Sequence, residues 1–300
     1  ISSTSVTELK GAASHLEKPL QSLIEANLEP LLAIRFLASE HVTGAKHGGR
    51  IDTLGIDENG CPVVIEYKRS LNENVITQGL YYLDWLMDHR ADFELLVQKK
   101  LGTEASEEID WADPRLICIA GEFTKFDAYA VDQIQRTIDL IRYRRFGTDL
   151  LLFEQVNAAE TELSRTDTRP TPSPKAKKSV LDSKPRPRWL PELSTTHAAV
   201  LEELERYVRS LGDDVERKNL KLYIAFKRLS NFATVVSWKS KFMLYLHLDP
   251  IVVRMEEGFT RDVRDLGHWG TGQLEVTLTS LTDLEKAKPY IQQAYEGGGT

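Results

Sequence analysis

The stretch that decides the fold is residues 49–68, which read GRIDTLGIDENGCPVVIEYK. Two runs rich in β-branched residues, 50–56 and 62–68, flank the turn-forming residues Asp-Glu-Asn-Gly. This pattern predicts a β-hairpin whose type I turn places Gly60 in the left-handed conformation. In that register Asp57 pairs with Cys61, and Asp52 falls opposite Glu66.

The charged residues of this hairpin predict a metal site. Glu66 and Lys68 are two residues apart, so they share a face of their strand with Asp52 opposite. Two facing carboxylates repel each other, and a divalent cation such as Mg²⁺ removes that penalty. Lys68 can then position or deprotonate a metal-bound water. The alternative is a surface hairpin with a plain Glu66–Lys68 salt bridge, but the apolar run 63–65 indicates a strand covered on both faces.

The wider pattern resembles the PD-(D/E)XK nuclease superfamily. Its signature is present as Ile51-Asp52 followed by Val64-Ile65-Glu66-Tyr67-Lys68. Downstream, Gln78 and Tyr82 match the Gln-x-x-x-Tyr element of RecB-like members, and on a helix they face the same way. Residues 49–69 also look like NucS-type endonucleases. The resemblance covers roughly residues 16–156.

This resemblance implies that Asp52 and Glu66 hold Mg²⁺ (or Mn²⁺) and that Lys68 is the third catalytic member. Gln78 and Tyr82 would orient the site or contact phosphate, although plain core packing is an equal alternative for Tyr82. The family often adds an acidic residue from the first helix. Glu25 is the candidate, and Glu17 and Glu29 compete with it. Gln21 stands where NucS-like proteins tend to carry an acid.

Four basic or polar residues are candidates for nucleic-acid contact. His47 and Arg50 flank the Gly48-Gly49 loop just before Asp52, where contact with DNA phosphate and a merely solvated loop are both open. Arg142 and Arg144 alternate onto one face of a predicted strand. They form either a DNA-facing patch or a salt-bridged surface.

The function implied is a Mg²⁺-dependent DNA endonuclease that hydrolyses phosphodiester bonds, in DNA repair or in anti-phage, restriction-type defence. DNA is the expected partner, and a homodimer is open because many relatives dimerise. The alternative is a catalytically silent protein that keeps the nuclease fold and binds nucleic acid or another protein.

Composition divides the chain into three segments. We expect a nuclease-like domain at residues 1–157, a linker at 158–190 and a second domain at 191–300. Residues 161–190 hold eight Lys/Arg against three Asp/Glu and many prolines. Such a segment cannot bury enough apolar surface to fold, so a flexible basic linker is predicted. The second domain resembles an uncharacterised module sometimes labelled a predicted transport protein, and protein partners are possible ligands for it.

The order of elements predicts the fold class. In the first domain we expect a helix, the hairpin, a helix, two strands, a helix and a second hairpin. That order favours an α/β, restriction-endonuclease-like fold with a mixed sheet and flanking helices. The second domain reads as a smaller α+β domain with an antiparallel sheet. The expected helices are 16–36, 74–89, 124–140, 195–211 and 283–295, and the strands outside the first hairpin are 93–97, 115–121, 141–147, 149–156, 222–226, 232–238, 241–248 and 273–279.

Composition, net charge and cysteine content limit the classes of protein to which the chain can belong. The 300 residues are 41% hydrophobic and 28% charged, as in ordinary soluble proteins. A net charge of −7 is not the global signature of a nucleic-acid binder, but a local basic groove is sufficient. Cys61 and Cys118 lack metal-binding spacing, which predicts two free thiols in a reducing cytoplasm. The apolar runs are too short to span a membrane, and the first residues lack the pattern of a secretory signal.

Overall fold

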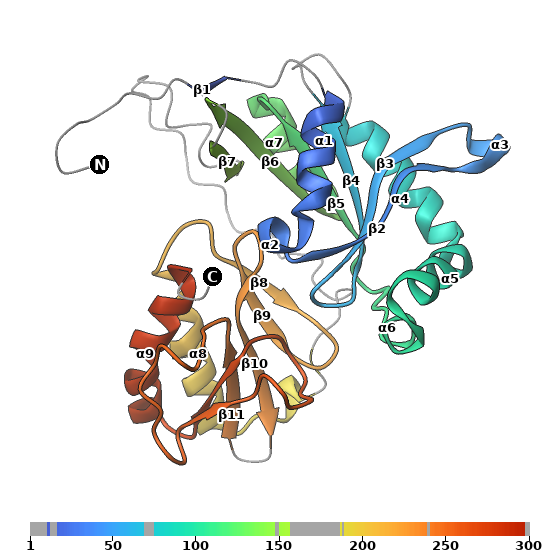
Figure 1. Ribbon diagram of the computed structural model, residues 1–300. Coiled ribbons are helices and arrows are strands. Elements are labelled where there is room, and N and C mark those ends of the chain that lie inside the picture. The colour runs from blue at the N-terminus through green and yellow to red at the C-terminus, as the bar shows by residue number, and fades with distance from the viewer. Residues whose placement is uncertain are drawn as a thin grey trace. The chain divides into compact units, whose positions relative to one another are not determined.

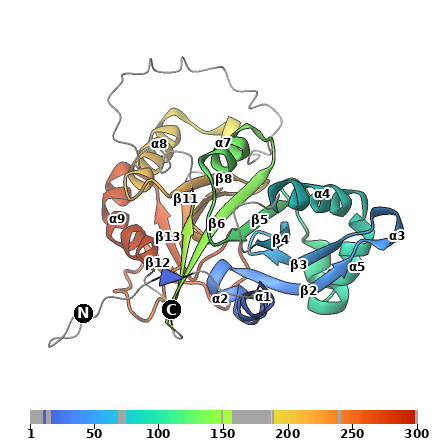
Figure 2. The same ribbon diagram turned by 90° about the horizontal axis from the view of Figure 1, so that it is seen from above.

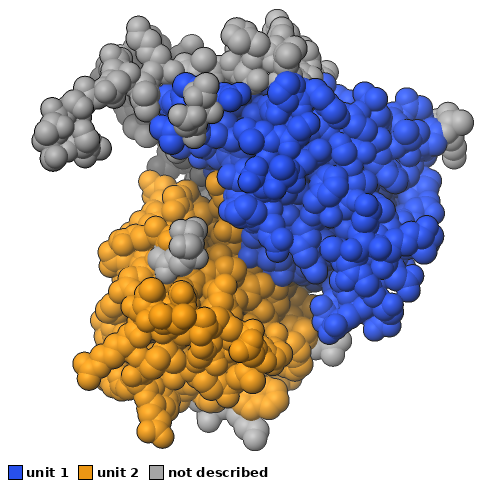
Figure 3. Space-filling model, viewed as in Figure 1, with its two compact units in different colours: residues 1–172 blue, residues 173–300 orange. Residues whose placement is uncertain are grey.

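The computed structural model describes residues 11–12, 17–68, 75–147, 150–156, 187, 189–238 and 241–297. It divides into two compact units, residues 1–172 and 173–300, which Figure 3 distinguishes by colour. The predicted linker 158–190 lies almost wholly outside the described residues, so its flexibility stays a prediction. In the described part of the chain, no helix has the length and apolar character needed to cross a membrane.

Unit 1 is built on a seven-stranded mixed sheet with the order β1-β6-β5-β4-β3-β2, and β7 pairs with β6. Strands β4, β5 and β6 are parallel, whereas β2, β3 and β4 are antiparallel neighbours. The mixed sheet expected from the sequence is thus confirmed. The strands are β1 Gly11–Ala12, β2 Ile34–Val42, β3 Arg50–Asp57, β4 Pro62–Lys68, β5 Arg115–Ala120, β6 Thr137–Phe146 and β7 Leu150–Gln155.

Helices cover both faces of this sheet (Figures 1 and 2). Along β3 and β4 successive side chains alternate between the faces. Leu54 and Val64 join a core with the helix α4, whereas Gly55 faces Leu28 of α2. Glu66 and Lys68 share the parity of Val64 on β4, and Asp52 is placed beside them by its contacts with Glu66 and Tyr67. The helices are α1 Glu17–Ala26, α2 Leu28–Leu32, α3 Gly44–His47, α4 Val75–Asp88, α5 Arg90–Leu101, α6 Thr103–Glu107 and α7 Lys125–Gln133.

Three predicted elements of unit 1 were wrong in type or extent. The first helix was predicted to reach residue 36. Instead, α2 ends where Ala33 adopts the left-handed conformation, and β2 begins at Ile34. Residues 93–97 were predicted as a strand and lie within α5, where Phe93 and Val97 are buried one turn apart. The helix predicted over 124–140 ends at Gln133, and its last residues belong to β6.

Unit 2 contains a six-stranded antiparallel sheet with the order β12-β13-β11-β10-β9-β8. Its two long helices, α8 and α9, bury their apolar stripes on one core with the inward side chains of the sheet. The α+β prediction is confirmed, while the short polar strands β8 and β12 were missed. The elements are η1 Leu190–Glu192, α8 Thr195–Arg209, β8 Glu216–Asn219, β9 Ile224–Lys227, β10 Asn231–Trp238, β11 Lys241–Leu246, β12 Thr260–Asp262, β13 Leu274–Leu278 and α9 Leu281–Tyr295.

Candidate functional site

The β3–β4 hairpin has the register predicted from its sequence. At the turn, the N–H of Asp57 donates to the carbonyl of Cys61 over 2.9 Å, and Gly60 has a φ of +76°. Thr53 pairs with Ile65 at the other end. One step further along the same ladder, Asp52 lies across from Glu66. Both cysteines of the chain are free and buried, as expected.

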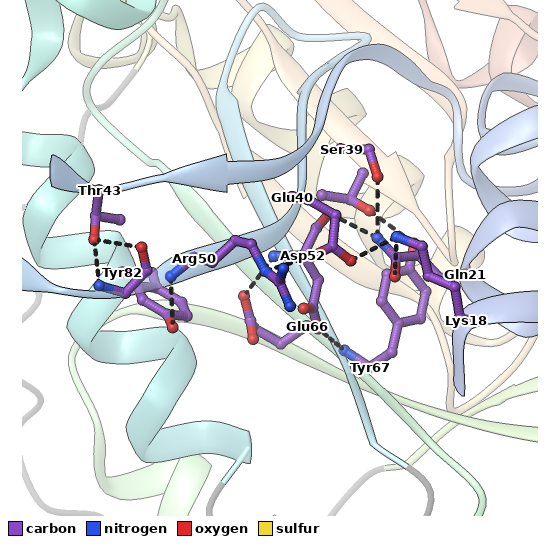
Figure 4. Close-up of polar contacts among 12 residues, drawn as sticks. Lys18, Gln21, Ser39, Glu40, Thr43, Arg50, Asp52, Glu66, Tyr67 and Tyr82 are labelled. Atoms are coloured by element: carbon purple, nitrogen blue, oxygen red, sulfur yellow. Dashed lines mark hydrogen bonds and ion pairs between the residues drawn. The ribbon is translucent and has the colours of Figure 1, made fainter. Parts of the chain in front are cut away.

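The carboxyl groups of Asp52 and Glu66 each accept a hydrogen bond from the backbone of the facing strand (Figure 4). The N–H of Asp52 donates to Glu66 Oε1 over 3.2 Å. The N–H of Tyr67 donates to Asp52 Oδ2 over 3.0 Å. Each carboxyl group is therefore fixed by the neighbouring strand, and the two are held side by side at the open end of the hairpin.

Burial dominates the electrostatics of Glu66. Its side chain has no exposed surface, and this desolvation together with the nearby charge of Asp52 raises its pKa to about 9. The charge of Lys68 opposes that shift. Glu66 Oε2 has no hydrogen-bond partner among the described residues. A buried oxygen in that state is costly unless a proton or a cation neutralises it.

This donor set fits a Mg²⁺ ion. Mg²⁺ is commonly bound by one or two carboxylates and keeps several waters, so Asp52 and Glu66 are sufficient side-chain ligands. No larger cluster competes: among the described residues no group of three or more His, Cys, Asp or Glu side chains is arranged to hold a metal. Asp52 and Glu66 are the residues that would hold the ion.

Glu25 hydrogen-bonds to residues other than Asp52 and Glu66. Its Oε1 accepts from the hydroxyl of Thr53 over 2.5 Å and from the amide of Gln21 over 2.9 Å. The hydroxyl of Thr53 also donates to that of Tyr67 over 3.3 Å. Glu25 of α1 therefore contacts Thr53 and Gln21, and its expected role as an added acid of the site stays a prediction. Its competitor Glu29 is exposed on α2, and the side chain of Glu17 lies outside the described residues.

Gln21 is the residue of α1 that contacts the site. It is 4% exposed, and its amide donates to the carbonyl of Asp52 over 2.8 Å and to Ser39 over 3.2 Å. The contact fixes the backbone of Asp52 from one side. Sequence reasoning noted Gln21 as a departure from the NucS-like pattern but assigned it no role.

Gln78 and Tyr82 face the same way on α4, as their spacing predicts. The amide of Gln78 donates to the hydroxyl of Tyr82 over 3.2 Å, and the N–H of Arg50 donates to the same hydroxyl over 3.2 Å. The ring is 5% exposed and presses on Gly49, where an added Cβ would lie 2.6 Å from it. The pair therefore anchors the start of β3, just before Asp52.

The four predicted nucleic-acid contacts have different surroundings. The carbonyl of His47 accepts from the hydroxyl of Tyr81 over 2.9 Å. The side chain of Arg50 is 63% exposed and pairs with Glu40. Arg142 is largely covered and pairs with Glu122 and Glu154, as the salt-bridged alternative expected. Arg144 is more exposed and lies 3.8 Å from Glu154.

One buried charge network was missed by the sequence reasoning. Arg115, at the start of β5, contacts Asp57 over 2.9 Å and Asp139 over 2.5 Å. All three side chains are buried, and the two carboxylates raise the pKa of Arg115 against the desolvation that would lower it. The network joins β3, β5 and β6 at the turn end of the hairpin. Nothing in the spacing of three residues so far apart in the sequence signals such a contact.

Comparison with known proteins gives one family match, one similar sequence and two similar solved structures. Residues 192–297 match the family described as a domain of unknown function, DUF5655. A protein of Haemophilus influenzae, described as uncharacterized, is 28% identical over 303 residues and covers 96% of each chain.

Two solved structures are similar to parts of the chain. One is an EndoMS–dsDNA2 complex, at 19% identity, a TM-score of 0.26 and coverage of 46% of this chain and 49% of that chain. The other is a repair endonuclease from Pyrococcus abyssi, at 19% identity, a TM-score of 0.28 and coverage of 44% and 50%. The chain thus spans about half the length of each endonuclease, and scores this low do not establish a common fold. We therefore base the function on the residues themselves.

Proposed function

We propose that unit 1 is a metal-dependent nuclease of the PD-(D/E)XK type, with a restriction-endonuclease-like fold, that hydrolyses phosphodiester bonds in DNA. The observation that supports it most is the paired carboxyl groups of Asp52 and Glu66. They are fixed side by side, and one buried oxygen of Glu66 lacks a partner among the described residues. The buried Oε2 of Glu66 is costly as it stands, and a bound cation would offset that cost.

The roles follow from the chemistry of each group. Asp52 and Glu66 would hold Mg²⁺ or Mn²⁺, which when bound polarises a phosphoryl oxygen and lowers the pKa of a coordinated water. Lys68 holds a positive charge beside the carboxyl groups and stabilises the negative charge that develops on phosphorus-bound oxygens. Gln21, Gln78 and Tyr82 position the strand that carries Asp52.

Cleavage of labelled DNA and RNA, with Mg²⁺ or Mn²⁺, tests this function. We expect the wild type to cut DNA, and Asp52→Asn and Lys68→Ala each to lower the rate by at least about a hundredfold, as expected when a group that stabilises the transition state is removed. Glu107→Gln is the matched control, because Glu107 is an exposed carboxylate of α6 remote in sequence from the hairpin. Full activity in Asp52→Asn would remove the role of that carboxylate.

Calorimetric titration with Mn²⁺ separates an enzyme from a silent binding protein. Binding by the wild type that is lost in Asp52→Asn supports the nuclease. If the protein binds DNA but no metal, whether or not DNA is present, the nuclease function is rejected. The alternative, a nuclease fold that binds without turnover, would then take its place.

A further inference from the structure

Glu40 has an unusual backbone conformation next to the candidate site. On β2, Ser39 pairs with Thr53 and His41 with Ile51, so Glu40 lies across from Asp52. Its φ is +54°, in the left-handed region that residues with a Cβ rarely adopt. Such a conformation is unfavourable for a residue with a Cβ and persists only where the surrounding structure imposes it.

Two cations converge on the carboxylate of Glu40 (Figure 4). Lys18 of α1 donates from Nζ to Oε1 over 2.5 Å, and Arg50 of β3 pairs through Nε with Oε2. The hydrogen bond from Lys18 and the charges of Lys18 and Arg50 lower the pKa of Glu40 despite its partial burial. The carboxylate therefore stays charged and gathers groups from two different elements at one point.

The group carries one more positive than negative charge, and its two cations are open to solvent. The side chains of Lys18 and Arg50 are 58% and 63% exposed. Ion pairs this exposed contribute little to stability, so fold stability gives no reason for bringing the three together. An ammonium group has three donors and a guanidinium five, more than one carboxylate can use. Arg also matches the geometry of a phosphate with its planar fork.

We propose that Lys18 and Arg50 form a phosphate-binding pair for a backbone phosphate of the nucleic acid, and that Glu40 is the positioning residue that sets them. The phosphate bound there is a neighbour of the one at Asp52 and Glu66, since Arg50 lies two residues before Asp52 on β3 and Glu40 lies across from it. This inference rests on the proposed nuclease function for the identity of the ligand.

DNA binding without turnover tests the pair. The full chain is titrated with a short labelled duplex in EDTA over a range of salt concentrations. For Lys18→Ala/Arg50→Ala we expect the slope of log K against log salt to fall by about 0.9, because the two cations share one phosphate and each phosphate contact contributes about 0.9. The control Lys99→Ala/Lys100→Ala makes the same change of charge on exposed residues of α5. Equal effects in the two variants, or no binding by the wild type, overturn the pair.

Glu40→Gln tests the positioning role. It removes the charge that gathers the two cations but keeps their positive charges, so we expect DNA affinity in EDTA to be retained and kcat to fall at least about tenfold. A loss of affinity equal to that of the cation variant, or an unchanged kcat, overturns this role. Asp52→Asn should leave the salt slope unchanged. If the cation variant loses the expected salt slope but the wild type does not cleave DNA, the nuclease function is rejected and the phosphate-binding pair is kept. If the wild type cleaves DNA but the cation variant keeps the wild-type salt slope, the phosphate-binding pair is rejected and the nuclease function is kept.

Discussion

At the scale of single residues, the protonation of Glu66 couples the site to folding. A carboxyl group whose pKa rises from about 4.5 in the unfolded chain to about 9 in the fold keeps its proton in the native state between these values. The unfolded state has already lost that proton, so the native state binds more protons over this range. Stability must therefore fall as pH rises from about 4.5 to about 9, by at most about 1.4 kcal/mol per pH unit from this group.

Replacing Glu66 by Gln should remove that dependence. In the absence of metal we expect Glu66→Gln to be more stable than the wild type at pH 8.5, with a smaller difference at pH 6, because the amide never loses a proton. Urea unfolding of both proteins in EDTA at the two pH values measures the difference. An equal difference at both pH values would contradict the raised pKa.

Glu25 should behave as a structural residue. Its carboxylate accepts from Thr53 and Gln21. We expect Glu25→Ala to cost about 1–3 kcal/mol of unfolding free energy, because it leaves the Thr53 hydroxyl without its acceptor. Mn²⁺ affinity should stay within about twofold of the wild type, since no ligand is removed. Urea unfolding and calorimetry measure both quantities, and a loss of metal binding at retained stability would return Glu25 to the site.

At the scale of elements, the hairpin was predictable because its information is local. The turn chemistry of Asp57–Gly60 and the alternation on either side fix which residues face each other. The helical conformation of α5 was not predictable in the same way, because a short apolar run fits a strand or a helix equally until its flanking residues are considered. Because one long first helix was predicted, strand β2 was missed. The position of Glu40 across from Asp52 was therefore missed too. Contacts of this kind depend on long-range pairing that one sequence does not reveal.

The contact between α4 and β3 gives a test at this scale. A methyl group at Gly49 would lie 2.6 Å from the ring of Tyr82. We expect Gly49→Ala to lower the unfolding free energy by about 1–3 kcal/mol through overpacking, and Tyr82→Leu to relieve part of that loss in the double variant. Gly267→Ala is the control, because nothing lies within 4 Å of its added Cβ. Thermal unfolding of the wild type, the two single variants, the double variant and the Gly267→Ala control measures the coupling, and an unchanged stability of Gly49→Ala would refute it.

At the scale of the whole molecule, two compact units with separate cores should respond separately to a core mutation. Arg115→Leu leaves Asp57 and Asp139 buried without their cation, which costs about 3–5 kcal/mol in comparable buried pairs. We expect faster amide hydrogen exchange across β3, β5 and β6, with exchange in α8, β10 and α9 unchanged. Mass spectrometry of peptic fragments measures both regions. Equal acceleration in both units would mean that they unfold as one.

The Asp57–Arg115–Asp139 network also separates two tasks along one hairpin. It fastens the turn end to the middle of the sheet, while the carboxyl groups of Asp52 and Glu66 occupy the opposite, open end. The two carboxyl groups proposed to bind metal can therefore be replaced without disturbing the Asp57–Arg115–Asp139 network. A related protein that has lost both Asp52 and Glu66 would remain folded, and it would be recognised by an intact Asp57–Arg115–Asp139 network without the two carboxyl groups.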